Sequence, residues 1–458
     1  MRISSAALIL ALGSTAVPAV QAAPLPSFNL GSIISSVLHN SLQEVAQAID
    51  GWNQAVEQAT DAWKHGKVTQ FNALSFVRKL ASKRYNHSVN WSKSTKFPGW
   101  KKWKANGVNL GTWLEIETNY APSAIPAEFN EEWTYCETVG KAVCGPVLEK
   151  HYDTWVTPSD VDLLSKYGVN TLRIPTTYAA WYDVPGSQLY HGNQQKKLRA
   201  VTEKATAKGM HVIIGLHSLP QGVNFLQIGE ASGHEGWWFN QTAFDYSLKV
   251  VSGVLDFIQS SSNPSMYTIA PINEPSNSIQ TFASPNTVHY PDGVNWLMTY
   301  LRAVYAMIEE RKMGTWLMQN DAFMGASYWA PLWDKSDRIV IDSHFYFFAA
   351  SGVYATYTGQ IACGQAQAAA EVDIPIFVGE WALQSYYNNS LALRGEIFNT
   401  QLYAWQTYLQ GGAFWSFRYE GTDNVSSGEG ATKDYWSYKN LIADGVVPAG
   451  GKIVGSYC

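Results

Sequence analysis

The sequence predicts an α/β fold, in which a closed barrel of eight parallel strands follows an N-terminal helical extension. From residue 107 onward, short apolar segments alternate with helical segments, which is typical of a parallel sheet. Eight such βα units favour a (β/α)8 TIM barrel over an open sheet. An open sheet would also need a Gly-rich phosphate loop after its first strand, and residues 107–111 (GVNLG) do not form one.

The predicted strands are short and apolar, and helical segments lie between them. We expect strands at residues 107–113, 171–175, 212–217, 267–273, 315–320, 339–346, 375–381 and 413–417. Among the helices between them, we expect residues 194–208, 244–259, 294–311 and 393–409.

Residues 1–22 are expected to be a secretory signal peptide. Arg2 precedes an apolar run at residues 6–12, and small residues up to Ala22 suit a cleavage site. The run is too short to span a bilayer, and no later run of about 18 apolar residues follows. We therefore expect a secreted, extracellular protein, free or associated with a cell wall, that does not interact with a membrane.

Residues 23–84 are expected to form a helical extension or a pro-segment. Apolar residues recur at helical spacing from residue 30 to about residue 80, and no strand pattern appears there. Lys83-Arg84 is either a dibasic maturation site or a pair of solvated charges. Residues 85–458 are expected to be the barrel domain that carries the chemistry.

The composition excludes several partners. The chain has 458 residues, 15% of them charged and 46% hydrophobic, so whole-chain disorder is excluded. Its formal net charge is −5, so no basic surplus is present to neutralise nucleic-acid phosphates. Aromatic residues make up 14% of the chain, which suits clefts that stack sugars. We expect a monomer that binds no nucleic acid.

The cysteines and the glycosylation sequons agree with export. Four cysteines allow three pairings and fit no zinc-site spacing. Cys136 with Cys144 would close a short loop, and Cys363 with Cys458 would attach the last residue to the body. A secreted chain can carry glycans at the sequons that begin at Asn86, Asn90, Asn240, Asn388 and Asn424.

Polar and aromatic residues gather where the predicted strands end. In such a barrel the carboxyl ends of all strands meet at one face, where the chemistry takes place. A lone Trp or Tyr at a strand end is more often core packing, but a set of this composition at one rim indicates a site. The set is Arg173, His217, Asn273, Glu274, His344, Tyr346, Glu380 and Trp415.

Glu274 and Glu380 are expected to face each other across the barrel mouth, at the ends of the fourth and seventh strands. Glycosidic cleavage needs such a pair, one carboxyl group to protonate the leaving oxygen and one to attack or to activate water. Arg173 and Tyr346 are expected to bond Glu380 and keep it ionised, and Asn273 to hold a sugar 2-hydroxyl. The alternative interpretation is a structural ion-pair network.

Two neighbouring features bear on substrate access and on metal binding. Gly379 is expected to let a substrate approach the strand that carries Glu380. Asp342 and His344 are metal-ligand types, but a third ligand at a usual spacing is missing. We therefore expect no metal and no cofactor.

Six short motifs resemble glycoside hydrolase family 5, and most of all its fungal exo-β-1,3-glucanase branch. The resemblance extends from about residue 100 to the C-terminus, and it implies a (β/α)8 barrel that retains anomeric configuration without a metal. The motifs are GVNLGTW (107–113), LRIP (172–175), NEP (273–275), HFY (344–346), GEW (379–381) and FWSF (414–417).

The resemblance also implies roles for single residues. It makes Glu274 the acid/base and Glu380 the nucleophile. Trp415 matches a glucose-stacking platform, and Glu117 matches a carboxylate that binds non-reducing-end hydroxyls. The rest of the family's active-site shell is matched by Arg173, His217, Asn273, His344 and Tyr346.

The chain departs from this branch on the aglycone side. The branch has glycine where this chain has Thr112, and it clamps the leaving sugar between two phenylalanines. Phe225 matches one of them. The other position is Ala349, although Phe347 and Phe348 lie close by in the sequence.

We therefore expect a secreted retaining β-glycosidase, in the first place a glucan 1,3-β-glucosidase that takes a β-glucan or a β-glucoside as substrate. A rutinosidase-type diglycosidase, which releases a whole disaccharide from a flavonoid glycoside, and a β-1,6-glucanase are the alternatives. A non-catalytic glycan-binding wall protein is an alternative of another class, and the presence of both glutamates argues against it.

Overall fold

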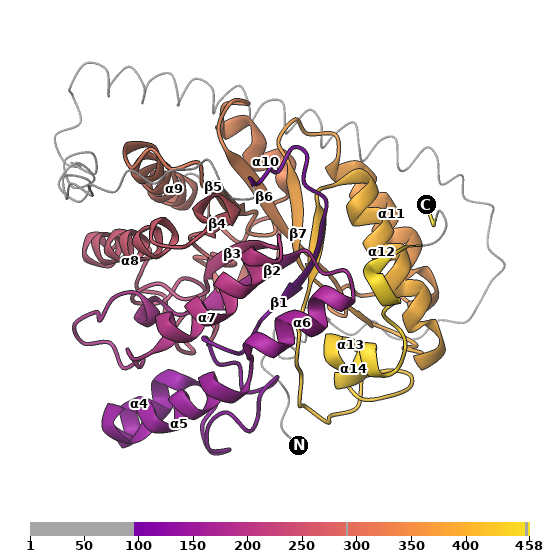
Figure 1. Ribbon diagram of the computed structural model, residues 1–458, viewed down its shortest axis with the longest axis horizontal. Coiled ribbons are helices and arrows are strands. Elements are labelled where there is room, and N and C mark those ends of the chain that lie inside the picture. Colours follow the sequence, from indigo (N-terminus) through magenta and orange to yellow (C-terminus); the bar gives the residue numbers. More distant parts are fainter. Residues whose placement is uncertain (1–95, 290–291, 454–456) are drawn as a thin grey trace, which may run out of the picture. The chain divides into compact units, whose positions relative to one another are not determined.

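The computed structural model describes residues 96–289, 292–453 and 457–458. Its centre is a closed barrel of parallel strands that pair in chain order from β1 to β8, with β8 pairing back to β1 (Figure 1). The predicted (β/α)8 barrel is confirmed. The expected signal peptide, the helical extension and Lys83-Arg84 lie outside the described residues.

Every predicted strand has a counterpart in the barrel. The first strand begins and ends earlier than predicted, and the left-handed φ of 61° at Thr112 excludes the extended conformation that was expected up to residue 113. The fourth strand also ends early, so Asn273 and Glu274 lie in the loop that follows it. The strands are β1 (Ala105–Asn109), β2 (Thr171–Thr176), β3 (His211–Leu216), β4 (Tyr267–Ala270), β5 (Trp316–Asn320), β6 (Ile339–Phe347), β7 (Ile376–Ser385) and β8 (Gly411–Phe414).

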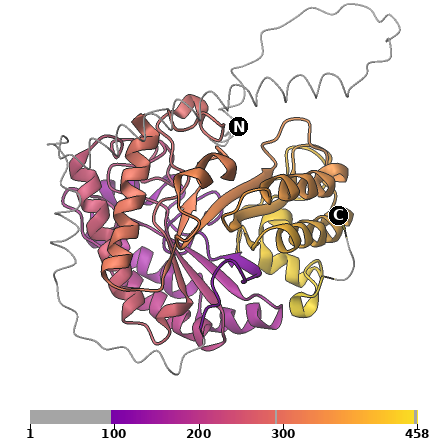
Figure 2. The same ribbon diagram turned by 90° about the horizontal axis from the view of Figure 1, so that it is seen from above.

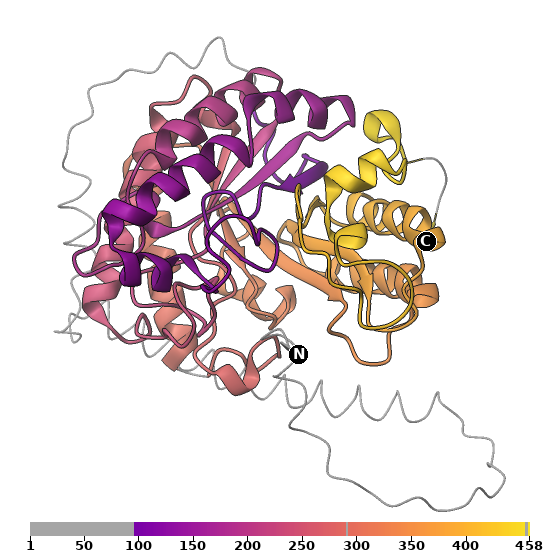
Figure 3. The ribbon, with the colours of Figure 1, turned by 90° about the horizontal axis from the view of Figure 1, so that it is seen from below.

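Helices surround the strands (Figures 2 and 3). Four of them match the predicted helices to within three residues: α7 (Gln194–Ala207), α8 (Gln241–Gln259), α9 (Asp292–Glu310) and α12 (Arg394–Tyr408). The others are α4 (Glu132–Val139), α5 (Lys141–Thr154) and α6 (Pro158–Lys166) before β2, α10 (Ala326–Trp329) and α11 (Thr358–Ala369) before β6 and β7, and α13 (Lys433–Trp436) and α14 (Tyr438–Ala443) after β8.

Helix α8 illustrates why the sequence forms these elements. The side chain of Asn240 accepts a hydrogen bond from Ala243 N at 3.1 Å, which satisfies a backbone donor at the start of the helix. Apolar residues at spacings of three and four then form one buried face. That face includes Phe244, Leu248, Val251, Leu255 and Ile258.

Apolar side chains close the barrel at the amino ends of its strands. Trp100 is fully buried, and its Nε1 donates to Thr268 Oγ1 at 2.9 Å. Trp100 packs with inward-facing residues of several strands, among them Ile213, Met318 and Phe377. Because this end is filled, polar side chains from the strands can meet around a site only at the carboxyl ends.

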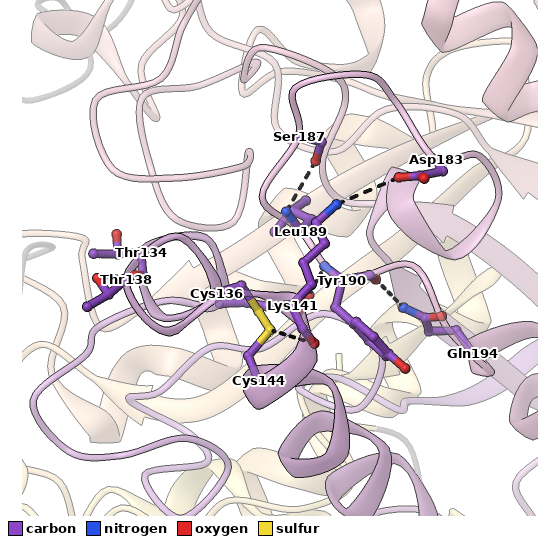
Figure 4. The surroundings of a disulfide bond; sticks show 11 residues. Thr134, Cys136, Thr138, Lys141, Cys144, Asp183, Ser187, Leu189, Tyr190 and Gln194 are labelled. Atoms are coloured by element: carbon purple, nitrogen blue, oxygen red, sulfur yellow. Dashed lines mark hydrogen bonds and ion pairs between the residues drawn. A yellow bond between two sulfur atoms is a disulfide. The ribbon is translucent and has the colours of Figure 1, made fainter.

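Two disulfides fix one of the three possible pairings. Cys136–Cys144 joins α4 to α5 across eight residues of sequence (Figure 4). Cys363–Cys458 joins α11 to the last residue of the chain across 95 residues. With both disulfides formed, no free thiol remains among the described residues.

Among the described residues, no helix is both long enough and apolar enough to cross a bilayer.

Candidate active site

Arg173 lies at the centre of the predicted site. It comes from β2, and 1% of its side chain is exposed. Its Nη1 donates to Glu380 Oε1 at 2.8 Å, and its Nη2 donates to Asn273 Oδ1 at 2.8 Å. Nη2 also contacts Asp342 Oδ2 at 3.3 Å. One buried cation therefore connects the ends of β2, β6 and β7 and the loop after β4.

Glu380, on β7, has both carboxylate oxygens held. Tyr346 donates to Oε2 at 2.8 Å, while Arg173 occupies Oε1. The two expected contacts are therefore present. Burial raises the pKa of Glu380, whereas His344, Arg173 and the Tyr346 hydrogen bond lower it. The expectation that Arg173 and Tyr346 keep Glu380 ionised stays a prediction.

Glu274 lies in the loop after β4, with a φ of 40°. Its Oε1 lies 2.6 Å from Nδ1 of His344, which comes from β6. Burial opposes protonation of His344, but Glu380 and Asp342 raise its pKa to about 10. At neutral pH the imidazole is therefore protonated, and Nδ1 donates to Glu274.

The two glutamates are close to each other. Single ligand atoms of Glu274, His344 and Glu380 lie within 4.8 Å of one another. These three side chains are types that can hold a metal, but the guanidinium of Arg173 and the protonated His344 already balance the carboxylates. The expectation of no metal stays a prediction.

His217 and Trp415 form one wall of the site. Their rings are stacked, with centroids 5.7 Å apart and planes inclined by 12°. His217 Nε2 lies 3.3 Å from Arg173 Nη1, and burial, Arg173 and His344 lower the pKa of His217. A neutral imidazole results, which can accept from a cation or a sugar hydroxyl. A side chain at Gly111 would meet the Trp415 ring at 2.9 Å, so glycine is needed there.

Glu117 is buried, and its Oε1 has no hydrogen-bond partner among the described residues. Burial raises its pKa well above the usual range, and so do the negative charges of Glu115, Glu380 and Glu274. These interactions connect Glu117 with both predicted catalytic carboxylates. Glu115 is also buried, and no sequence motif marks it as a site residue.

Phe225 is half-buried in the loop after β3, and its φ is 67°. Its neighbour Asn224 donates from Nδ2 to the backbone oxygen of Glu274 at 3.2 Å, which ties this loop to the loop of the acid/base candidate. At the other clamp position Ala349 is exposed. Phe348 instead packs 5.1 Å from Trp436 of α13, a residue that no motif pointed to.

Three buried polar residues support the site and were not recognised from the sequence as its members. Asn109, at the end of β1, accepts from Arg173 at 3.0 Å and donates to the backbone oxygen of Gly379 at 2.8 Å. Asn320, at the end of β5, lies 3.2 Å from His344 Nε2. Asp342 was weighed only as a metal ligand. Their position at the ends of predicted strands is the sequence signal that could have identified them as site residues.

Gly379 has a different role from the expected one. A Cβ at this position would lie 1.8 Å from Asp342 Oδ1. The space beside the strand is therefore taken up by a buried carboxylate of the neighbouring strand, and it is not an approach path for substrate.

A barrel rim with two closely spaced carboxylates, a buried arginine and a stacked indole defines a glycosidase class of site. Residues 136–420 match the family model Cellulase (glycosyl hydrolase family 5). This match covers more than half of the chain, so the protein belongs to glycosyl hydrolase family 5 and is a glycosyl hydrolase.

Two curated relatives are glucan 1,3-beta-glucosidases. The chain is 29% identical over 287 residues to probable glucan 1,3-beta-glucosidase A of Aspergillus niger, which is 60% of this chain and 64% of that protein. It is 27% identical over 252 residues to glucan 1,3-beta-glucosidase 1 of Schizosaccharomyces pombe, which is 53% of this chain and 58% of that protein. The chain therefore spans less than two thirds of either relative.

Two solved structures match over almost their whole length. The crystal structure of AoRut is 40% identical with a TM-score of 0.74, and the match covers 77% of this chain and 99% of that one. The crystal structure of rutinosidase from Aspergillus niger is 38% identical with a TM-score of 0.73 and the same coverage.

Proposed function

We propose that this chain is a retaining β-glycosidase in which Glu380 is the nucleophile and Glu274 the acid/base. The spacing of the two carboxylates carries this proposal. Oxygen atoms of Glu274 and Glu380 lie within 4.8 Å of each other. Retaining enzymes separate the two groups by about 5–5.5 Å, whereas inverting enzymes need about 6.5–9.5 Å to fit a water.

In the first step, a Glu380 oxygen attacks the anomeric carbon while the bond to the leaving oxygen breaks. Glu274 gives its proton to that oxygen, and the sugar stays on Glu380 as an ester. In the second step, Glu274 takes a proton from water, the water oxygen bonds to the anomeric carbon, and Glu380 leaves as a carboxylate. Two inversions at the same carbon retain its configuration.

The other predicted residues fit the binding of a β-glucose unit. Asn273 Oδ1 is held by Arg173, which leaves its amide nitrogen to donate to a 2-hydroxyl. Glu117 Oε1 is buried without a hydrogen-bond partner among the described residues, and it would accept from a sugar hydroxyl further from the cleaved bond. Trp415 would supply an apolar face for the sugar ring, and Phe225 would contact the leaving group.

Two substrate classes follow from the relatives. The curated relatives support a glucan 1,3-β-glucosidase, which the motifs favoured first. A rutinosidase is supported by a longer and closer match, with 40% identity over 99% of one solved chain against 29% over 64% of a curated relative. The same two-glutamate mechanism serves both, and the substrates differ in the sugar and the aglycone beyond the cleaved bond.

A product analysis separates these classes. Purified protein is incubated in parallel with laminarin, a β-1,6-glucan and rutin, with products followed by chromatography and the new anomer by NMR. β-Glucose from laminarin supports the glucanase, and intact rutinose from rutin supports the diglycosidase. Release of the α-anomer would contradict the retaining mechanism, and glycan binding without any released sugar would favour a non-catalytic protein.

We also propose that the chain is secreted as a monomer and that residues 85–458 form the catalytic domain. The signal-like residues 1–22, the sequons and the two disulfides support export. N-terminal sequencing of the exported protein tests whether residues 23–84 are removed. A start at Tyr85 means removal of a pro-segment after Lys83-Arg84, and a start near Ala23 means that the helical extension stays.

A further inference from the structure

Three tyrosine rings lie exposed next to one another on the loops that follow β6 and β7. Tyr354 is 41% exposed, Tyr357 56% and Tyr387 37%. The Tyr354 and Tyr387 rings are 5.1 Å apart, and Tyr357 lies 6.5 Å from Tyr354. We name these three residues the tyrosine platform. Seven large hydrophobic side chains are exposed in the described residues, and the platform gathers three of them in one patch.

Backbone hydrogen bonds fix the platform. Tyr354 and Tyr387 form a parallel bridge, in which Ala355 N donates to Tyr387 O at 3.0 Å and Tyr387 N donates to Val353 O at 2.9 Å. The next residue but one, Asn389, is bridged to Gly428 in the segment after β8. Figures 2 and 3 show this segment beside the loops after β6 and β7. Loop backbone held in this way loses little freedom on binding.

The platform shares strands with the catalytic residues. Strand β6 carries His344 and Tyr346, and β7 carries Glu380 and ends at Ser385, two residues before Tyr387. The platform therefore lies on the loops at the carboxyl ends of the strands, the face where substrates bind in this fold.

The ring orientations favour a chain of sugars over a single flat molecule. The planes of Tyr354 and Tyr387 are inclined by 36°, and those of Tyr354 and Tyr357 by 84°. The rings thus offer several separate faces, where one slot between parallel rings would suit a planar aromatic ligand. A pyranose has an apolar C–H face and polar edges, which matches a tyrosine ring with its hydroxyl group.

We propose that the tyrosine platform is an auxiliary binding site for β-glucan, apart from the sugar subsites around Glu274 and Glu380. Sugar units of a long substrate stack on the exposed rings while another part of the molecule enters the barrel mouth. This proposal rests on the proposed function, because the ligand is the glycan class that such an enzyme meets.

Affinity electrophoresis in gels that contain laminarin tests the platform. All variants carry Glu380→Gln to stop turnover and Asn388→Gln to keep a glycan off the adjacent sequon. Replacing both Tyr354 and Tyr387 by alanine should weaken laminarin binding about tenfold or more. Replacing both by phenylalanine should preserve most of the binding, because the ring faces remain.

The matched control is Phe239→Ala, which removes another ring that is 56% exposed but lies before α8. It should leave laminarin binding unchanged. The proposal is overturned if the double alanine variant binds like its parent, or if the control loses as much affinity. Thermal melting of each variant checks that the fold is kept.

A small substrate separates this proposal from the proposed function. With Glu380 intact, the double alanine variant should hydrolyse p-nitrophenyl β-glucoside within about twofold of its parent, because the platform is independent of the catalytic residues. If the double alanine variant lost as much activity on p-nitrophenyl β-glucoside as it lost affinity for laminarin, the auxiliary role of the platform would be overturned. If the parent cleaves none of p-nitrophenyl β-glucoside, laminarin and rutin, the proposed function fails, and the laminarin gels still decide whether the platform binds glycan.

Discussion

Tyr346→Phe removes one hydrogen bond from the proposed nucleophile and changes little else. The Tyr346 hydroxyl donates to Glu380 Oε2 at 2.8 Å, and the ring packs on Trp436 with centroids 5.3 Å apart, a contact that phenylalanine keeps. A hydrogen bond to a charged group contributes about 1.5–3 kcal/mol. If the bond acts in the transition state, kcat/KM falls about ten- to hundredfold, since about 1.4 kcal/mol is tenfold.

The same variant should shift the pH profile. The Tyr346 hydrogen bond lowers the pKa of Glu380, against the rise caused by burial. Without it, the pKa of Glu380 is higher, and the nucleophile is ionised only at higher pH. The acid limb of kcat/KM therefore moves upward in pH.

The assay is the initial rate on p-nitrophenyl β-glucoside, or on rutin if that is the substrate, from pH 3 to pH 9. Tyr408→Phe is the matched control, because its phenol accepts from Gln367 at 3.0 Å on the outer helices. It should leave both rate and profile unchanged. A Tyr346→Phe enzyme with wild-type kcat/KM and an unmoved acid limb would refute the assignment of Glu380 as the group that Tyr346 supports.

Three further predictions concern the buried charges and the chain terminus. Arg173→Met leaves Asp342 and Glu380 buried without their cation. The free energy of unfolding, measured in urea, should therefore fall by about 3–5 kcal/mol, and a fall of less than about 1 kcal/mol would contradict this. The pKa of His344 is raised from an ordinary 6.5 to about 10, so its stabilising contribution is complete below pH 6.5 and lost toward pH 10. Melting temperatures across that window should fall less in His344→Gln than in wild type. Cys458→Ser opens a disulfide that closes 95 residues, so stability should fall by up to about 4.7 kcal/mol, and an unchanged denaturant midpoint would contradict the cross-link's role.

The barrel was predictable because each strand is a local pattern. A parallel strand buried on both faces is a short apolar run, and the chain order of such runs is also their order around a closed barrel. The rule that strand ends meet at one rim then brought together residues from six strands and the loops after them, without any knowledge of their contacts. The predicted end of the first strand was wrong because local apolar pattern does not show backbone angles such as the left-handed φ of 61° at Thr112.

The supporting side chains of the site were harder to find. Arg173 and Glu380 are 207 residues apart in the chain, yet their side chains are in contact. Strand periodicity says that a residue is buried, but it does not say which buried carboxylate faces which cation. The sequence therefore indicated only that Asp342 could be a metal ligand in a site that lacks a third ligand. It likewise suggested that Gly379 leaves room for substrate to approach its strand. The Asp342 carboxylate lies where a side chain at position 379 would otherwise be.

The position of His344 couples the two steps of the proposed mechanism. Its Nδ1 is 2.6 Å from Glu274 and 3.5 Å from Glu380, so it senses both carboxylates. Of the groups that raise the pKa of His344, Glu380 is the largest. When Glu380 becomes an ester it loses its charge, and the pKa of His344 must fall because that attraction is gone. The imidazole then holds its proton less strongly. In the proposed mechanism, the charge of Glu380 thus acts through His344 on the hydrogen bond that Glu274 accepts.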